Sequence, residues 1–216
     1  SDPSDARIRI AQRYCLDPTA SSWVMYAPTW RESLSTGAWS ASMFDELDLG
    51  KLGSMLGPEW TILVRGHNHN SRMESRVSRS ANIVDVTDYP EINDLILGAD
   101  VAVLDYSSLR FDWAITEKPV LYFVPDKEEY FDRRPGLFDY DDSAPGAQVT
   151  STEEAAKEIL RKDEYHERFG TELDIFNARF NSFSDGRAAE RVVESFFSDI
   201  LCCLLYTSDA ADDMQC

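Results

Sequence analysis

Residues 100–125, DVAVLDYSSLRFDWAITEKPVLYFVP, contain the pattern that decides the fold. Two runs, 100–104 and 119–124, which are apolar apart from Asp100, read as short strands, and the segment between them, 107–116, is predicted to be a helix. From residue 101 to 104 and from 119 to 124 the apolar residues are consecutive rather than alternating, which predicts strands that are covered on both faces. A strand, a helix and a second strand in this order predict two parallel strands joined by a crossover.

The same alternation extends to both sides of this unit. Further strands are predicted at 23–27, 60–64 and 82–86, and further helices at 5–15, 43–56, 90–98, 152–162 and 186–201. The sequence therefore predicts the α/β class, with a Rossmann-like parallel sheet flanked by helices, and the last two helices are expected to pack on that sheet.

Composition and charge restrict the possible functions. The chain has 216 residues, of which 43% are hydrophobic, so one compact domain with a real core is expected. A formal net charge of -18 argues against nucleic-acid binding, which requires clustered cations. No apolar run approaches the roughly 18 residues that span a bilayer, and no signal-peptide pattern opens the chain. These features predict a cytoplasmic protein.

Three segments are distinguished along the chain. Residues 1–20 are interpreted as a linker helix from a missing N-terminal domain, because the helical pattern begins abruptly. Residues 21–201 form the predicted nucleotide-binding domain. Residues 202–216, CCLLYTSDAADDMQC, resemble the translation of a sequencing adapter and are interpreted as a non-native tail.

Polar side chains follow the predicted strands at the point where each strand ends. In an open parallel sheet, ligands bind beyond these carboxyl ends, because loops diverge there and helix N-termini present unpaired N–H groups. The candidate residues there are Thr29, Arg31, Arg65, His67, Asp88, Tyr89, Asp105, Ser107 and Ser108. On so acidic a chain, cations at this edge predict a site for an anion.

Each candidate also has an ordinary structural interpretation. Ser107 and Ser108 could cap the backbone of the following helix or bind a phosphate. Arg31 and Arg65 could belong to surface salt bridges. Asp112, in the first turns of the same helix, could contact a ligand hydroxyl or only favour the helix dipole.

The histidines and cysteines do not predict a metal site. His67 and His69 lack a third ligand at suitable spacing, and His166, in a charged helical segment, is interpreted as a solvated surface residue. The cysteines have neither metal-ligand spacing nor a pattern that indicates disulfides; they are Cys15, Cys202, Cys203 and Cys216.

The order of several short motifs resembles the C-terminal half of the CDP-glycerol glycerophosphotransferase family, of the teichoic-acid-polymerase type. The motifs are YAPTWR at 26–31, VRGH at 64–67, DVTDYPEIND at 85–94, ADV at 99–101, DYSS at 105–108, FD at 111–112, KPV at 118–120, FDY at 138–140 and APG at 144–146. The resemblance covers about residues 8 to 195, and the ordered series is more specific than any one motif.

The resemblance implies the C-terminal, donor-binding domain of a GT-B fold. The family transfers glycerol phosphate from CDP-glycerol to the terminal hydroxyl of a lipid-linked polymer in bacterial wall teichoic acid synthesis, releasing CMP at the inner membrane face. No cofactor is implied beyond the donor substrate. The candidate base for the acceptor hydroxyl is a histidine of the family's N-terminal half, so this chain is expected to bind donor without polymerising it.

The resemblance also implies roles for particular residues. His67 matches the histidine that stabilises the diphosphate and its leaving group, and Ser107 and Ser108 match the phosphate-holding turn, with Arg31 and Arg65 as supporting cations. The loop from Asp88 to Asn93, including Tyr89, is the candidate for cytidine contacts, and Asp112 for the glycerol end.

Two departures from the family pattern leave the donor open. Arg110 replaces a usually apolar residue, and Asn68-His69 replaces the commoner residues after the histidine, which could indicate another CDP-alcohol. Two alternatives are a GT-B glycosyltransferase or nucleotide-sugar epimerase with a different nucleotide donor, and a non-catalytic nucleotide-binding module.

Overall fold

The computed structural model describes residues 2–19, 21–29, 47–66, 82–133, 136 and 139–197. Contacts divide the chain into two units, Ser1–Asn177 and Ala178–Cys216, and the second contains a helix at 188–197. The strands of the first unit are β1 (Ser22–Tyr26), β2 (Trp60–Val64), β3 (Ile83–Asp85), β4 (Val101–Leu104), β5 (Val120–Phe123) and β6 (Ala147–Val149). Its helices are α1 (Pro3–Tyr14), α2 (Leu49–Leu56), α3 (Ile92–Gly98), α4 (Leu109–Ala114), α5 (Lys127–Arg133), η3 (Asp141–Ser143), α6 (Thr152–Leu160) and η4 (Lys162–Glu164), together with most of α7 (Tyr165–Phe180), whose last three residues belong to the second unit.

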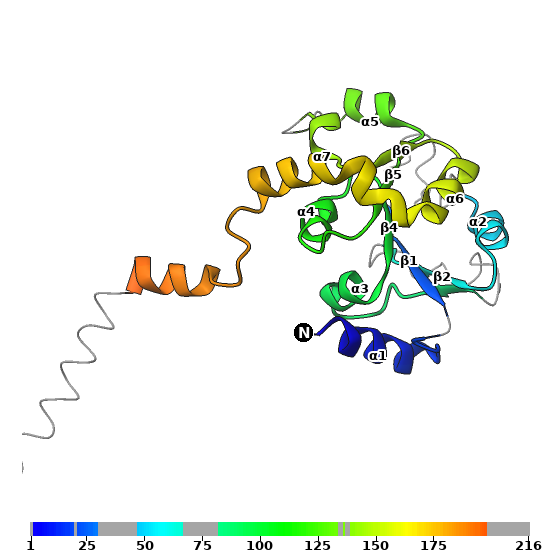
Figure 1. The fold of residues 1–216 in the computed structure, drawn as a ribbon, viewed down its shortest axis with the longest axis horizontal. Helices are drawn as coiled ribbons and strands as arrows, with labels where there is room; N and C mark the ends of the chain where they lie inside the picture. Colours follow the sequence, from blue (N-terminus) through cyan, green and yellow to red (C-terminus); the bar gives the residue numbers. More distant parts are fainter. Residues whose placement is uncertain are drawn as a thin grey trace, which may run out of the picture. The chain divides into compact units, whose positions relative to one another are not determined.

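The six strands form one parallel sheet in the order β3-β2-β1-β4-β5-β6 (Figure 1). In register, Tyr26 of β1 lies beside Val64 of β2 and Val103 of β4, so the three strands end together. This order matches the doubly wound Rossmann sheet: β2 and β3 extend the sheet to one side of β1, and β4, β5 and β6 extend it to the other, so the order of the strands reverses between β1 and β4. The predicted class is therefore confirmed.

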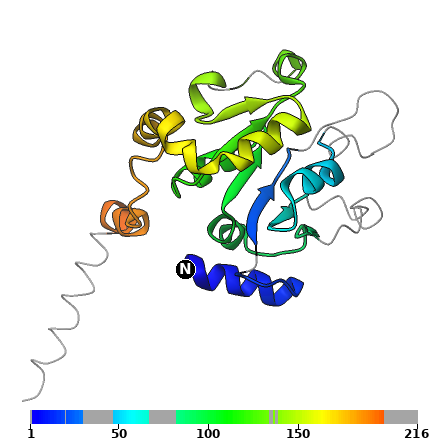
Figure 2. The ribbon, with the colours of Figure 1, turned by 45° about the vertical axis from the view of Figure 1, so that its right-hand side comes forward.

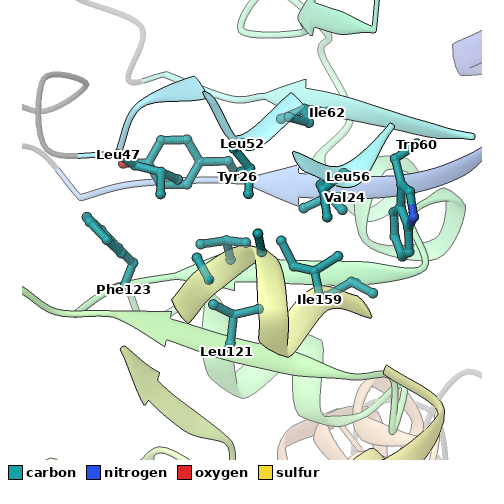
Figure 3. Packing of buried hydrophobic residues seen from close by; sticks show 14 of the residues in the cluster. Val24, Tyr26, Leu47, Leu52, Leu56, Trp60, Ile62, Leu121, Phe123 and Ile159 are labelled. Carbon is teal, nitrogen blue, oxygen red and sulfur yellow. The ribbon is translucent and has the colours of Figure 1, made fainter. Parts of the chain in front are cut away.

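One face of the sheet is covered by α2 and α6. Val24, Ile62 and Leu121 point from the strands toward Leu52 of α2 and Ile159 of α6 (Figure 3). Figure 2 shows both helices, cyan and yellow, on this face. Burial of these apolar groups, at about 25 cal/mol per Å² removed from water, is the main force that holds the layers together.

Local signals start the helices on this face. The Asp48 carboxylate accepts from the amide of Lys51 at 2.9 Å and caps α2. At α6, the Ser151 hydroxyl accepts from the amide of Glu154 at 3.3 Å, while the Glu154 carboxylate accepts from the amide of Thr150 at 2.9 Å. These contacts resemble a capping box, which explains why α6 begins where the sequence predicts.

The opposite face is covered by α3 and α4, and α1 packs against the outside of α3 (Figure 1). The close approach depends on Gly98, where a Cβ atom would lie 2.8 Å from Cδ1 of Ile10. The Arg7 guanidinium donates to the carbonyls of Gly98, Pro18 and Ser21, at 2.8, 2.7 and 2.6 Å. The segment predicted as a linker is thus joined to the sheet by specific contacts.

The predicted and observed elements agree most closely where strands are buried. β2 has the predicted bounds, and the other four predicted strands are each confirmed within a residue or two. The sequence patterns did not predict β6 or α5, and for α7 they indicated only a charged helical segment around His166. Packing of the helix at 188–197 on the sheet stays a prediction. Among the described residues, no helix has the length and apolar character needed to cross a bilayer.

The structure assigns a role to Lys118, which sequence analysis noted only as a motif residue. Its ammonium donates to the carbonyls of Ile96, Leu97 and Ala99 at 3.2, 2.5 and 2.9 Å, at the C-terminal end of α3. Burial lowers the pKa of this ammonium. The lysine therefore satisfies carbonyls that the end of the helix leaves without partners.

We expect Lys118→Met to lower the free energy of unfolding by about 2 kcal/mol, because the apolar stem is kept while three carbonyls lose a charged donor. Urea denaturation measures the change. Lys157→Met, at an exposed position on α6, is the matched control and should change stability by less than about 0.5 kcal/mol. Equal effects of the two substitutions would contradict the assigned role.

Candidate active site at the carboxyl edge of the sheet

The candidate site lies where β1 and β4 end side by side. The strand order reverses here, so the segments after the two strands turn away from each other toward opposite faces. Pro28 and Thr29 follow β1, and the segment from Asp105 to Ser108 follows β4. Because the sheet is parallel, Arg65 and Thr87, after β2 and β3, lie at the same edge.

Asp105 joins the segments on the two sides of this reversal. Its residue surface is 2% exposed, and its carboxylate accepts from the amide and the hydroxyl of Thr29 at 2.7 and 2.5 Å. The amide of Ser107 also donates to Asp105, at 3.1 Å. Thr29, Asp105 and Ser107 were all predicted to bind substrate. The structure shows the side chain of Asp105 engaged in fixing the backbone around it, so direct contact with a ligand stays a prediction.

The turn formed by Ser107 and Ser108, called the serine turn from here on, has the geometry of a helix start. The Ser107 hydroxyl accepts from the amide of Leu109 at 3.2 Å, which is the capping interpretation of this residue. Ser108 is the N-cap residue of α4, yet its exposed side chain makes no capping hydrogen bond. Asp112 is exposed in the first turn of the same helix. The Ser108 hydroxyl and the Asp112 carboxylate are therefore open to solvent at this edge.

Arg65 is the described cation nearest to the end of β2. Its half-buried guanidinium donates to the carbonyl of Tyr89 and, at 3.5 Å, to that of Val86. Desolvation by burial lowers the pKa of Arg65, while Tyr14 and Asp88 oppose that shift. Across the described residues, no carboxylate forms a salt bridge with it. Its positive charge is thus not neutralised by a direct partner within this part of the chain.

The loop between β3 and α3 holds the two candidates for cytidine contacts. The Tyr89 side chain is buried, and its hydroxyl donates to Asp94 at 2.9 Å. Asp88 is exposed but bound by Arg13 and Tyr14 of α1, at 2.6 and 2.5 Å. Hydrogen bonds from Tyr14 and then Arg13 lower the pKa of Asp88. The structure turns both side chains toward α1, and their contact with a nucleobase stays a prediction.

An aromatic group that sequence analysis did not assign lies beneath the serine turn. The Tyr140 hydroxyl donates to the backbone carbonyl of Asp105 at 2.7 Å. The Tyr106 hydroxyl donates to Asp126 at 2.8 Å, and its ring stacks on that of Tyr130 with centroids 3.8 Å apart. Arg110 donates to the Tyr106 carbonyl at 3.2 Å. The FDY motif was the available signal for Tyr140.

Two predicted site residues, Arg31 and His67, lie outside the described residues, as does His69. Gly66, which precedes His67, is described: its amide donates to the Thr87 hydroxyl at 2.8 Å at the carboxyl edge. Convergence of His67 and Arg31 on the serine turn stays a prediction. Among the described residues, no group of three His, Cys, Asp or Glu side chains is placed to hold a metal ion.

Comparison with protein families identifies a match over most of the chain. The family described as CDP-Glycerol:Poly(glycerophosphate) glycerophosphotransferase matches residues 2–198. The teichoic acid poly(glycerol phosphate) polymerase of Bacillus subtilis (strain 168) is 29% identical over 91% of this chain and 26% of the relative. The teichoic acid glycerol-phosphate transferase of Staphylococcus aureus (strain NCTC 8325 / PS 47) is 30% identical over 83% of this chain and 46% of the relative. A teichoic acid poly(ribitol-phosphate) polymerase of Bacillus spizizenii (strain ATCC 23059 / NRRL B-14472 / W23) is 32% identical over 79% and 27%.

Solved structures agree with these relatives. The wall teichoic acid polymerase TagF has a TM-score of 0.75 and 27% identity, over 93% of this chain and 48% of that chain. A variant of TagF soaked with CDPG has a TM-score of 0.71 and 28% identity, over 93% and 47%. The likeness confirms the predicted GT-B type of Rossmann-like fold. The chain spans less than half the length of these relatives and structures.

Proposed function

Because the chain belongs to the CDP-glycerol:poly(glycerophosphate) glycerophosphotransferase family, we propose that it is the donor-binding half of an enzyme that transfers glycerol phosphate from CDP-glycerol. The acceptor is the terminal hydroxyl of a lipid-linked poly(glycerol phosphate) or a related wall or capsule polymer, and CMP is released. In this proposal the enzyme works at the inner face of the membrane as a peripheral protein and requires no cofactor beyond the donor.

The observation that carries this proposal is the arrangement at the reversal between β1 and β4. Thr29 and Ser107 are tied together through Asp105, and Arg65 lies at the end of the next strand without a carboxylate partner among the described residues. A prearranged backbone with an unneutralised cation suits a diphosphate. This local charge is the exception that an anionic ligand needs on a chain of net charge -18.

The chemistry follows from where charge develops. Displacement of CMP from the phosphorus breaks the bond to the bridging oxygen and places negative charge on that oxygen and on the equatorial oxygens. We assign His67 to the leaving group, Arg31 and Arg65 to the diphosphate, and Ser107 and Ser108 to the phosphate oxygens. These groups stabilise charge without a covalent intermediate.

A base that activates the acceptor hydroxyl is still required for the full rate. In this proposal that base is a histidine of the N-terminal half of the family's enzymes, to which this chain does not correspond. The chain alone then binds donor without transferring it. Incorporation of labelled glycerol phosphate into a lipid-linked acceptor by this chain alone would contradict that part of the proposal.

The donor test is calorimetric titration of the chain with CDP-glycerol. We expect His67→Ala and Ser107→Ala each to weaken binding more than tenfold, roughly 1.4 kcal/mol, because each removes a contact to charged oxygens. His166→Ala on α7 and Ser54→Ala on α2 are the matched controls, since both residues are exposed. Unchanged affinity in both site variants would remove the site assignment, and no binding by the parent chain would remove the function.

One relative favours a second donor. The poly(ribitol-phosphate) polymerase is 32% identical to this chain, and Arg110 departs from the usual apolar residue in the serine-turn helix. CDP-ribitol is therefore the second candidate. A competition experiment measures binding of CDP-glycerol, CDP-ribitol and a UDP-sugar to the chain. Preference for one of the two CDP-alcohols identifies the donor, and preference for the UDP-sugar favours the glycosyltransferase alternative.

A further inference from the structure

Helix α1 makes two separate contacts here, one with the loop between β3 and α3 and one with the first turn of α3. At the first, Asp88 accepts from Nη2 of Arg13 at 2.6 Å and from the Tyr14 hydroxyl at 2.5 Å. The rings of Tyr14 and Tyr89 lie 6.2 Å apart between their centroids. The polar end of α1 is thus directed at the loop.

The second contact is more deeply buried. Both carboxylate oxygens of Asp94 are bound by Arg9, from Nε at 2.9 Å and Nη2 at 2.6 Å. The Tyr89 hydroxyl donates to the same carboxylate at 2.9 Å. A forked arginine contact fixes direction as well as distance, so Tyr89 and the start of α3 are oriented by α1.

The same loop then contacts the residues at the end of β2. The Tyr89 carbonyl accepts from the Arg65 guanidinium, and the Thr87 hydroxyl accepts from the amide of Gly66 at 2.8 Å. Within the described part of the chain, the loop from Val86 to Glu91 therefore links α1 to Arg65 at the candidate anion site. Among the described residues, the Arg65 side chain donates to carbonyls of this loop, those of Val86 and Tyr89.

We infer that helix α1 positions the anion site: Arg13 and Tyr14, with Arg9, hold the β3–α3 loop so that its Tyr89 carbonyl orients the guanidinium of Arg65. Exposed ion pairs such as that of Arg13 with Asp88 add little to stability, so their geometry is more informative than their strength. This inference rests on the proposed function for its ligand. Arg9, Arg13 and Tyr14 are positioning residues, and none is assigned a contact with donor.

The test compares an α1 variant, Arg13→Gln with Tyr14→Phe, with the parent chain. We expect the Kd for CDP-glycerol to rise three- to tenfold while the thermal midpoint changes by less than about 2 °C. On an Arg65→Met background the same pair of substitutions should change Kd less than twofold, because the residue that it positions is gone. Restoring charge with Arg13→Lys and the native tyrosine should recover at least half of the affinity.

Arg161→Gln is the matched control. Arg161 is partly exposed, pairs with Glu164 at 2.5 Å, and lines a small cavity with Val101 and Pro119 at the amino ends of β4 and β5. It should leave Kd unchanged. If the double variant does not fold, Tyr14→Phe alone, which removes one hydroxyl, replaces it.

A readout without ligand separates this inference from the proposed function. In ¹H–¹⁵N spectra of the chain without donor, the α1 variant should shift the Arg65 Nε–H and Gly66 amide signals, and Arg161→Gln should not. Unshifted signals, unchanged Kd, or an equal loss of affinity on the Arg65→Met background would each overturn the inference. If the α1 variant shifts these signals but the parent chain binds no CDP-glycerol, the proposed function is removed and α1 is still the positioning element.

Discussion

Replacement of Asp105 by alanine is expected to lower the free energy of unfolding by about 3 kcal/mol, the largest effect of any site substitution. The carboxylate accepts from three donors, two on Thr29 and one on Ser107. Asp105 is buried and directly follows β4, where the strand order of the sheet reverses. Alanine leaves these donors without a partner. A loss of this size is a large fraction of the stability of a typical domain.

Urea denaturation measures the stability of this variant, and calorimetry at a temperature where it remains folded measures donor affinity. We expect binding of CDP-glycerol to weaken more than tenfold, because the segments after β1 and β4 lose their common anchor. Asp105→Asn keeps the shape and one acceptor oxygen and should retain part of both properties. Wild-type stability with lost affinity would instead indicate that Asp105 contacts the ligand directly.

Arg7→Ala is expected to destabilise the fold by about 3 kcal/mol without any contact with the site. The guanidinium donates to three carbonyls and to the Asp100 carboxylate at 3.0 Å, and it lies 4.1 Å from the ring centre of Trp23. Its loss removes the join between α1, α3 and the start of β1. Hydrogen exchange should show faster opening of α1 and α3 than of β4.

Gln12→Ala, at an exposed position of α1, controls for helix propensity and should stay within about 0.5 kcal/mol of the parent. Arg7→Lys keeps the charge, but an ammonium group cannot reproduce the hydrogen bonds that the planar guanidinium makes in several directions, so most of the loss of stability should remain. If Arg7→Lys were as stable as the parent, charge alone would explain the role of this residue.

The buried strands could be predicted because their signal is local. Trp60–Val64 is apolar apart from Thr61, is buried throughout, and agrees with the prediction at both ends. β6 has three residues, and its central Gln148 is exposed, so periodicity could not reveal it. It forms because β5 offers it an edge to pair with. α5 has no buried residue, and the stacking of Tyr130 on Tyr106 is a tertiary contact.

The site residues were predicted less completely than the strands. That Thr29, Arg65 and Ser107 would lie at one edge followed from parallel strands alone. The partners of the neighbouring residues did not follow from it: the structure shows Asp88 bound by Arg13 and Tyr14, and its contact with a nucleobase stays a prediction. No local pattern connects residues 74 or 75 positions apart in the chain.

The sequence by itself determined the class of the fold, the places of its central strands and the polar residues that follow them, because hydrophobic runs and turn residues act over a few positions. Only the tertiary structure decided that β1 and β4 are neighbours, that the Asp105 carboxylate accepts hydrogen bonds from Thr29 and Ser107, and that α1 contacts the loop beside Arg65. Such contacts join distant segments, and their geometry exists only once the layers have packed.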